Sequence, residues 1–300
     1  MANVLISGGS GLIGRTLSKL LLQKGHSVVH LGRKENLSSV IKCYRWDLSM
    51  EWIDERAFEN IDAIVNLAGA GIADKRWTTE RKKEIFESRI ISSSLLINEA
   101  NKRLGQVKVF VGGSAIGFYG AVTTDKIYKE NDLPGNDFMA DVCVKWENKY
   151  HRLNPNIRKV IIRTGVVLSN EGGALPKLLT PIKFGVGAAI GSGKQVIPWI
   201  HINDIVSLFY EAICNESVNG IYNGVAPNPV NNLQLNQVIV KQLKKPFFLP
   251  NVPGVMLKLL LGEMAVMVTE GSAISSEKTR SIPFQFQFPE IEGALIDLLN

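Results

Sequence analysis

The stretch Asn3-Val-Leu-Ile-Ser7 is a short apolar run that continues directly into Gly8-Gly9-Ser10-Gly11-Leu12-Ile13-Gly14. The run predicts a buried strand, the glycines predict a tight turn, and residues 15–24 predict a helix. In this order the turn lets backbone N–H groups approach phosphate oxygens, and the helix dipole favours their negative charge. A strand before the glycines and a helix after them distinguish a dinucleotide-binding turn from an ordinary one. The chain is therefore expected to bind a dinucleotide through residues 8–14.

The end of the second predicted strand bears on which dinucleotide is bound. Gly25 is expected to stop the first helix, and residues 27–32 to form this strand. In NAD-binding folds an acidic residue about twenty positions after the glycines accepts a hydrogen bond from the ribose 2′-hydroxyl. Here Arg33 and Lys34 follow the strand, and a planar, always charged guanidinium suits the 2′-phosphate of NADP. Glu35 would favour NAD, and the two basic residues could instead form a solvated turn, but NADP is the expected cofactor.

The composition is that of a globular protein and argues against several classes. A chain of 300 residues allows one large or two smaller domains, and 45% hydrophobic with 21% charged residues is ordinary. The 34 basic and 28 acidic residues give a net charge of +6, but the basic residues are scattered, so no nucleic-acid site is expected. Cys43, Cys143 and Cys214 lie far apart, which argues against disulfides and a zinc site and favours a reducing compartment. No signal peptide, membrane span or metal site is expected, and the predicted location is cytoplasmic, with an organelle matrix as the alternative.

Strand-like and helix-like patterns alternate through the first half of the chain. Further strands are expected at residues 41–46, 61–67, 107–111 and 157–163, and helices at residues 80–104 and 138–152. Thr78 or Thr79 is the expected N-cap of the first of these helices, and Gly105 its stop. The alternation predicts an α/β fold with a doubly wound parallel sheet of the Rossmann type. Residues 1–164 are expected to form this NADP-binding domain.

After residue 164 the pattern changes to more glycine turns, more prolines and shorter helices. Residues 165–300 are therefore expected to form a smaller α+β lobe that binds substrate and packs with the first domain as one unit. The alternating residues 284–288 predict an edge strand, and residues 291–299 a short helix. Residues 257–267 are apolar but too short to span a membrane, and they predict a helix of the core.

Ligands of open α/β sheets bind beyond the carboxyl ends of the strands. Asp47 follows the strand predicted at residues 41–46, so it is placed to accept a hydrogen bond from the adenine amino group. It could equally be a turn or helix-cap residue.

Three motifs resemble the extended short-chain dehydrogenase/reductase superfamily. The spacing Gly8-x-x-Gly11-x-x-Gly14 is similar to its T-G-x-x-G-x-[IL]-G motif, with Ser7 at the threonine position. Asn66-Leu67-Ala68-Gly69 resembles its N-x-A-G turn, and Ser114-Ala-Ile-Gly-Phe-Tyr-Gly120 resembles its S-S-x-x-x-Y-G segment. The resemblance implies that Leu67, Ala68 and Gly69 run beneath the adenosine half of the cofactor. It also implies that Ser114 lies near the hydroxyl that hydrogen-bonds the substrate oxygen, although a plain loop serine is the alternative.

The acid–base pair of this superfamily is missing. Its members carry Tyr-x-x-x-Lys on the next helix, where the lysine holds the nicotinamide ribose and lowers the pKa of the tyrosine. None of the 6 tyrosines here has a lysine four residues later. When Glu147 is aligned with the glutamate that often ends this segment, Met139 and Cys143 stand at the two positions.

Tyr119 and Ser114 are the preferred substitutes for the missing pair, Tyr119 because it lies in the active-site loop and could donate a proton. Cys143 and Lys145 are the alternatives. A free cysteine is more often a small buried hydrophobe, and Lys145 lies two positions from the expected lysine, on another face of the helix.

The second half of the chain extends the resemblance. Pro198-Trp-Ile-His-Ile-Asn-Asp-Ile205 resembles the pocket-lining F-I-H-V-x-D-L segment, which implies that Trp199 and His201 line the substrate pocket. His201 and Asp204 could form an acid–base pair. The favoured alternative is that Asp204 caps the following helix and His201 packs against it.

Segments along nearly the whole chain resemble one atypical branch of the superfamily, the epimerase family proteins, also described as cell-division-inhibitor-like or nucleoside-diphosphate-sugar epimerase-like. The matching segments are Asn66–Gly71, Arg76–Thr78, Ser88-Arg89, Ala115–Gly120, Trp146-Glu147, Arg163–Leu168, Gly172–Leu175, Trp199–His201 and Gly262–Ala265. This resemblance implies NADP binding and supplies no established substrate.

Two functions remain open. The chain is either an NADP-dependent oxidoreductase or epimerase with a non-standard proton donor, or a non-catalytic NADP(H)-binding redox sensor or partner scaffold. Hydride chemistry belongs to the cofactor, so loss of the tyrosine does not exclude the enzyme, which is the preferred function. The expected partners are an unidentified small-molecule substrate and, as in relatives, a second copy of the chain in a homodimer.

Overall fold

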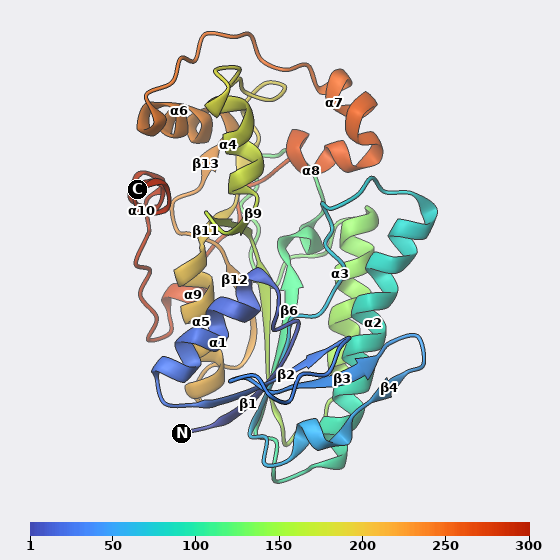
Figure 1. The fold of residues 1–300 in the computed structure, drawn as a ribbon. Helices are drawn as coiled ribbons and strands as arrows, with labels where there is room; N and C mark the ends of the chain where they lie inside the picture. Colours follow the sequence, from blue (N-terminus) through green and yellow to red (C-terminus); the bar gives the residue numbers. More distant parts are fainter.

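The computed structural model describes residues 1–300 as an α/β fold around one eight-stranded sheet (Figure 1). The strands lie in the order β12-β7-β6-β5-β1-β2-β3-β4 and run parallel, except that β4 pairs antiparallel with β3. Their bounds are β1 Asn3–Ser7, β2 Ser27–Gly32, β3 Cys43–Asp47, β4 Trp52–Ile53, β5 Ala63–Asn66, β6 Val109–Ala115, β7 Arg158–Thr164 and β12 Gly220–Gly224. The sheet is the doubly wound, Rossmann-type sheet that the sequence predicted.

Helices cover both faces of this sheet, α1 and α5 on one face and α2 and α3 on the other (Figure 1). Their bounds are α1 Leu12–Gln23, α2 Thr79–Lys102, α3 Phe138–Lys149 and α5 Ile202–Cys214. In β1, Val4 and Ile6 join the core that includes α1 and α5, whereas Leu5 joins the core that includes α2 and α3. A strand covered on both faces has to be a continuous apolar run, which explains the composition of residues 4–6.

The helix ends follow the signals in the sequence. Thr78 is the N-cap of α2, and its hydroxyl accepts a hydrogen bond from the N–H of Arg81 at 3.2 Å. Asp137 caps α3 in the same way through the N–H of Ala140 at 2.9 Å. After α1, Gly25 takes a φ of +81°, which the missing side chain permits. The ends of the helices relative to the sheet are therefore set by local residues.

The chain after residue 164 forms smaller elements beyond the carboxyl ends of the strands and also returns to the large sheet (Figure 1). β11, β8 and β9 form a three-stranded sheet, and β10 pairs with β13. The remaining strands are β8 Val166–Ser169, β9 Gly172–Gly173, β10 Val196–Ile197, β11 Trp199–His201 and β13 Val230–Asn231. The remaining α-helices are α4 Leu175–Lys183, α6 Asn232–Leu243, α7 Gly254–Leu261, α8 Val266–Thr269, α9 Glu277–Arg280 and α10 Ile291–Leu299. Four short 3₁₀ helices are labelled η1 Glu55–Phe58, η2 Ile116–Tyr119, η3 Tyr150–Arg152 and η4 Gly262–Ala265. The domain boundary after residue 164 stays a prediction. Strand β12, which follows this boundary in the sequence, pairs with β7, which precedes it, so the two parts of the chain share the large sheet.

The prediction of an edge strand at residues 284–288 is wrong, because these residues form no strand. The N–H groups of Gln287 and Phe288 donate instead to the carboxylate of Asp204, at 2.7 and 3.0 Å. Phe284 packs into the main core. The alternation of apolar and polar residues is therefore real, but a single side chain takes the place of a partner strand.

The prediction of one core helix at residues 257–267 is also wrong. Gly262 takes a φ of +62° and ends α7, and η4 and α8 follow it. No residue of α7 is buried, and Val255 and Leu259 are largely exposed. None of the helices in the structure is both long enough and apolar enough to span a membrane.

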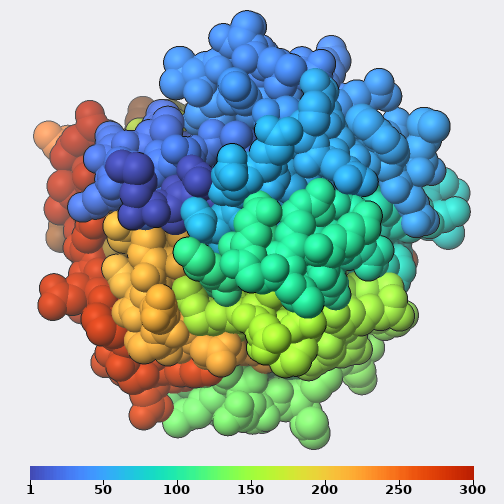
Figure 2. Space-filling model, turned by 90° about the horizontal axis from the view of Figure 1, so that it is seen from below, coloured from blue at the N-terminus to red at the C-terminus, as the bar shows by residue number.

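Figure 2 shows the opposite end of the molecule, where the strands begin. The N-terminus (dark blue) lies there with the segments that enter β6 (green) and β7 (lime) and with the end of α5 (orange). Met1, Lys108, Arg158 and Cys214 from these four segments line one cavity of about 360 Å³. Because open α/β sheets bind ligands at the carboxyl ends of their strands, the cofactor is expected at the other end.

We predict that Gly14→Ala destabilises the fold. A Cβ at Gly14 would lie 2.8 Å from the Cα of Gly9 and closer still to the carbonyl of Gly8, so the turn would have to open. The expected loss in the free energy of unfolding is about 1–3 kcal/mol, measured by urea denaturation.

The matched control is Gly293→Ala in α10, where a Cβ meets nothing within 4 Å. This variant should be neutral or more stable by up to about 1 kcal/mol, since alanine is the better helix former. Equal stability of the two variants would contradict the close packing of the turn.

Candidate functional site

The glycine turn between β1 and α1 forms a close backbone cradle. Gly8 has a φ of +72°, and a Cβ on it would lie 2.7 Å from the carbonyl oxygen of Leu67. The N–H groups of Leu12, Ile13 and Gly14 in the first turn of α1 have no protein acceptor, and no side chain caps this helix. Free N–H groups and the positive end of a helix dipole are what a pyrophosphate requires. The residues present therefore fit a dinucleotide.

The residues after β2 differ in whether they have ionic partners. Arg33 and Lys34 are exposed and have no carboxylate within 4.0 Å. Glu35, the residue that would favour NAD, pairs with Arg56 at 2.7 Å, and Arg56 also pairs with Asp54 at 2.6 Å. The free charge at the end of β2 is therefore positive, which suits a 2′-phosphate. The ion pair of Arg56 with Glu35 could not be predicted from the sequence, because the two residues are 21 positions apart.

Asp47 is the last residue of β3, and its side chain holds the turn that follows. Its Oδ1 accepts hydrogen bonds from the hydroxyl of Ser49 at 2.6 Å and from the N–H of the same residue at 3.1 Å. These hydrogen bonds lower the pKa of Asp47, and the one from the Ser49 hydroxyl has the largest effect. The role of Asp47 toward adenine stays a prediction.

Asn66 at the end of β5 joins four elements. Its Oδ1 accepts from the hydroxyl of Ser7 at 2.7 Å, and its Nδ2 donates to the hydroxyl of Ser93 at 2.9 Å. The indole of Trp146 donates to the same hydroxyl at 2.9 Å. Asn66 thus ties β1 and β5 to α2 and α3 and fixes the start of the turn Leu67-Ala68-Gly69. This turn lies against the glycine cradle through Gly8, as a cofactor-binding turn should, and its cofactor contacts stay predictions.

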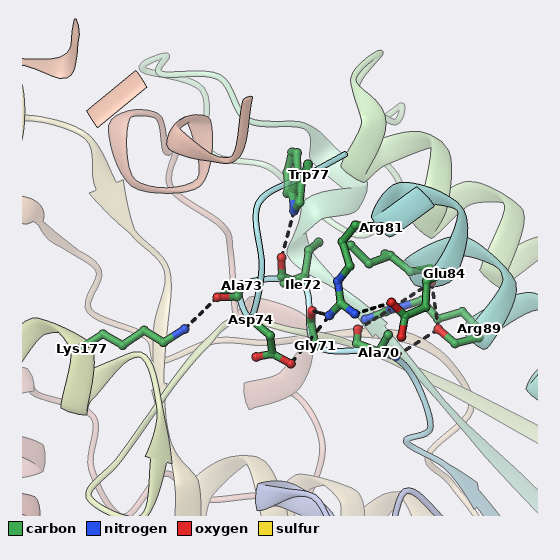
Figure 3. A network of polar contacts seen from close by, with 12 residues as sticks. Ala70, Gly71, Ile72, Ala73, Asp74, Trp77, Arg81, Glu84, Arg89 and Lys177 are labelled. Atoms are coloured by element: carbon green, nitrogen blue, oxygen red, sulfur yellow. Dashed lines mark hydrogen bonds and ion pairs between the residues drawn. The ribbon is translucent and has the colours of Figure 1, made fainter. Parts of the chain in front are cut away.

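The loop that follows this turn is held by cations (Figure 3). Arg81 and Arg89 reach it from α2, and Lys177 reaches it from α4. Arg81 donates to the carbonyl of Gly71, Arg89 Nη1 donates to the carbonyl of Ala70 at 3.0 Å, and Lys177 donates to the carbonyl of Ala73 at 2.8 Å. The loop is therefore the link between the sheet and the elements above it.

Ser114 at the end of β6 belongs to a buried polar network. Its hydroxyl donates to Glu147 Oε1 at 2.6 Å, and Arg163 donates to both carboxylate oxygens, at 2.9 and 2.8 Å. The side chains of Arg163 and Glu147 are only 2% and 7% exposed. The guanidinium also lies 3.4 Å from the ring centroid of Phe118. Ser114 therefore orients a buried ion pair, and its predicted catalytic role stays a prediction.

Tyr119 in η2 belongs to the same network. Its hydroxyl donates to Asn223 Oδ1 at 2.7 Å and accepts from Arg163 Nη1 at 3.0 Å. Burial raises the pKa of Tyr119 to about 12, despite the nearby Arg163. The phenol is therefore protonated at neutral pH, which is the form that a proton donor requires.

Met139 and Cys143 lie at the carboxyl edge of the sheet, as their alignment with the missing pair requires. A Cβ on Gly117 would lie 3.2 Å from Met139 Cβ and 3.7 Å from Cys143 Sγ. Burial raises the pKa of the Cys143 thiol to about 12, so the neutral thiol is its neutral-pH form. Lys145 pairs with Asp141 at 2.8 Å on the exposed face of α3. These environments agree with the alternatives of a small buried hydrophobe for Cys143 and a solvated side chain for Lys145.

Trp199 and His201 of β11 are fully buried. The indole of Trp199 donates to the carbonyl of Asn228 at 3.1 Å. His201 is the N-cap of α5, because its Nδ1 accepts from the N–H of Asn203 at 3.1 Å, and its ring stacks on Phe288 at 3.9 Å. Their predicted contact with substrate stays a prediction.

His201 and Asp204 do not form a pair. His201 Nε2 lies 3.2 Å from Asp297 Oδ2, and burial lowers the pKa of the imidazole. Asp204 accepts from the N–H groups of residues 287 and 288, so it holds the C-terminal segment and does not cap α5 as expected.

Sequence reasoning missed the ion pair of Glu147 with Arg163 and the part of Asn223. The signal was present as an arginine directly after the apolar run Val160-Ile161-Ile162 of β7 and a glutamate beside Trp146 on a buried helix face. A charged residue at such a position requires a partner, but the sequence does not say which.

A family model described as the NAD dependent epimerase/dehydratase family matches residues 4–223, and a domain of unknown function, DUF1731, matches residues 252–298. The chain is 36% identical to the "Epimerase family protein SDR39U1 homolog, chloroplastic" of Arabidopsis thaliana, over 97% of this chain and 85% of that protein. The crystal structure of the human epimerase family protein SDR39U1 with NADPH superposes with a TM-score of 0.90, at 31% identity, over 99% of this chain and 98% of that chain. A nucleoside-diphosphate sugar epimerase from Corynebacterium glutamicum superposes with a TM-score of 0.82, at 30% identity, over 99% of this chain and 58% of that chain.

We predict that Glu147→Gln strongly destabilises the protein, because it leaves the Arg163 guanidinium buried without its counter-charge. Removing one partner of a buried ion pair typically costs about 3–5 kcal/mol of the free energy of unfolding. Urea denaturation followed by circular dichroism measures this loss.

Asp141→Asn on the same helix is the matched control, because the pair of Asp141 with Lys145 is exposed. It should change the free energy of unfolding by no more than about 0.5 kcal/mol. A Glu147→Gln loss as small as that of the control would show that the buried pair does not hold the site together.

Proposed function

The chain belongs to the NAD-dependent epimerase/dehydratase family, and from this premise we propose that it is an NADP(H)-dependent oxidoreductase or epimerase acting on a small-molecule substrate. One observation carries the choice of NADP. Beside the glycine cradle, Arg33 and Lys34 are exposed without acidic partners, whereas Glu35 is occupied by Arg56. The relative of known structure crystallised with NADPH supports the same choice.

The proposed binding site follows the glycine cradle and the two strands that flank β1. The pyrophosphate binds the free N–H groups of residues 12–14, and Arg33 binds the 2′-phosphate as a planar, bidentate donor. Leu67, Ala68 and Gly69 line the cofactor on the side of β5. When bound, NADP(H) supplies the hydride chemistry of the family.

The chain's own contribution to the reaction is then a proton and a fixed geometry. Tyr119 is the proposed proton donor, since its phenol stays protonated at neutral pH and Arg163 and Asn223 hold it in place. Ser114 acts through Glu147 on the same network. Trp199 and His201 are proposed to line the substrate pocket.

A second candidate is a non-catalytic NADP(H)-binding sensor or scaffold. One observation in its favour is that the hydroxyls of Ser114 and Tyr119 both donate to protein side chains. The other is the exposed apolar helix α7, where Val255, Leu259 and Leu260 are 72%, 76% and 67% exposed. An exposed apolar patch of this kind is typical of a binding surface. A homodimer, and a location in the cytoplasm or an organelle matrix, are proposed from family resemblance and cysteine usage alone.

We predict that the protein prefers NADPH to NADH and that Arg33→Ala abolishes this preference. Loss of a charge-assisted contact to the 2′-phosphate should weaken NADPH binding by about 10- to 100-fold and leave NADH binding unchanged. Titrations followed by nicotinamide fluorescence measure both affinities.

Arg152→Ala is the matched control, because Arg152 is an exposed arginine beyond the end of α3. It should leave both affinities unchanged, whereas a general attraction between positive protein and negative cofactor would make it resemble Arg33→Ala. Equal affinities of the wild type for the two cofactors would overturn the choice of NADP, and binding of neither would overturn the proposed site.

We predict that Tyr119→Phe lowers kcat for a carbonyl substrate found by screening NADPH oxidation, by about 100-fold or more, as for loss of a general acid. Because burial raises the pKa of Tyr119 to about 12, the wild-type rate should show no alkaline loss from this group below about pH 9, unlike an enzyme whose tyrosine has a lowered pKa.

Tyr128→Phe is the control, since this neighbouring ring lies 5.3 Å from Tyr119 and is not assigned a role. Full activity of Tyr119→Phe would exclude this residue as the proton donor. Tight NADPH binding without turnover of any carbonyl compound in the screen would favour the sensor over the enzyme.

A further inference from the structure

Arg89 of α2 is a partly buried cation without an acidic partner. Its Nη1 donates to the carbonyls of Ala70 and Ile85 at 3.0 and 2.9 Å, and no carboxylate lies within 4.0 Å. Its Nε and Nη2 donate to no protein atom. Burial is the main influence on the pKa of Arg89 and lowers it.

Arg81, two turns earlier on the same helix, shows the ordinary arrangement. Its guanidinium pairs with Glu84 at 2.6 Å and lies 3.7 Å from Asp74 (Figure 3). Both arginines hold carbonyls of the same loop, but Arg89 differs from Arg81 in having no carboxylate partner. A charge without a counter-charge is costly where burial excludes water. A ligand that accepts hydrogen bonds from Arg89 would therefore stabilise its unpaired positive charge.

The position of Arg89 identifies which ligand group it faces. A Cβ on Gly69 would lie 3.0 Å from Arg89 Cζ, so the guanidinium covers the turn after β5. Cζ also lies 5.1 Å from the ring of Trp146, one turn beyond Cys143 on α3. Arg89 and Cys143 are close enough to influence each other's ionisation. The guanidinium therefore occupies the region that a lysine at the Cys143 position would reach.

The order of the strands assigns this region to one half of the cofactor. β1 is flanked by β2 and β3 on one side and by β5 and β6 on the other. A dinucleotide in a doubly wound sheet lies across this switch point, with its adenosine half over the side of β2. Arg33 follows β2, whereas Arg89 covers the turn after β5. The family resemblance places this turn beneath the adenosine half, but the strand order puts it across the glycine cradle from β2. By strand order, Arg33 and Arg89 thus lie on opposite sides of the proposed pyrophosphate site.

We propose that Arg89 takes the place of the missing lysine and donates to the ribose on the nicotinamide side of NADP(H). This inference rests on the proposed function, since it requires that the cofactor binds. A guanidinium at this place differs from a lysine in one chemical respect: it stays charged at every physiological pH, so it holds the ribose without passing a proton.

The experiment compares two probes, NADPH and 2′,5′-ADP, which has the adenosine half and the 2′-phosphate but no nicotinamide riboside. Calorimetric titration gives the affinity of each for wild type, Arg89→Met and Arg33→Ala. Arg89→Met should weaken NADPH by about 10- to 100-fold, the usual effect of losing charge-assisted hydrogen bonds, and leave 2′,5′-ADP unchanged. Arg33→Ala should weaken both probes.

Two further variants separate the charge from the hydrogen bonds to the loop. Arg89→Lys keeps the charge and should restore NADPH binding to within about five-fold of wild type, since each lost hydrogen bond is worth about 1 kcal/mol. Arg89→Gln keeps an N–H donor for the carbonyls of Ala70 and Ile85 but should bind NADPH as weakly as Arg89→Met. Thermal unfolding without ligand verifies that all variants are folded.

Each result decides the inference. Equal weakening of NADPH and 2′,5′-ADP by Arg89→Met, or wild-type NADPH affinity in Arg89→Gln, would show that Arg89 only supports the loop, and would overturn the proposal. Absence of NADPH and 2′,5′-ADP binding in the wild type would instead overturn the proposed function and this inference with it.

Discussion

The buried ion pair between Arg163 and Glu147 is the interaction on which the site depends. Two charges removed from water are tolerable only when nearly all their hydrogen-bonding capacity is used. Here the carboxylate takes two donors of the guanidinium and the hydroxyl of Ser114, while the guanidinium also binds Tyr119 and stacks on Phe118. Because these partners come from β6, η2, α3 and β7, the pair fixes the carboxyl edge of the sheet on the side of β6.

One orientation of the proposed cofactor across the carboxyl edge of the sheet explains where the cations without carboxylate partners lie. Arg56 and Arg81, two basic side chains near this edge, have carboxylate partners. Arg33 beyond β2 and Arg89 beside β5 do not, and the glycine cradle at β1 lies between them. A ligand with negative charge at one end, a pyrophosphate in the middle and a polyhydroxylated group at the other end matches this order. The net charge of +6 adds a general attraction for such an anion, but only these local cations give it an orientation.

The sequence predicted the features that depend on neighbouring residues. The buried strands, the glycine turn and the N-cap Thr78 each arise from a pattern within about ten residues, and all are present in the structure. Features that depend on distant residues could not be predicted. The pairing of Glu35 with Arg56 spans 21 positions, and residues 284–288 satisfy their backbone through Asp204, 83 and 84 positions away, without a neighbouring strand. In the site, the backbone cradle was therefore predictable from the sequence, whereas the partners of Ser114, Tyr119 and Arg89 were not.

The change from a lysine to an arginine at this edge restricts the chemistry that the site can perform. A lysine beside a tyrosine both holds the ribose and lowers the pKa of the phenol, so the pair can take up or release a proton near neutral pH. Here the phenol is held by Arg163 and Asn223, burial keeps it protonated, and the cation at the ribose cannot release a proton. Reduction of a carbonyl needs only a donor and is compatible with this arrangement. Oxidation of an alcohol, the first half of an epimerisation, needs the same phenol in its deprotonated form, which the raised pKa disfavours. If Tyr119 has its proposed role, this arrangement would therefore favour reduction of a carbonyl over epimerisation.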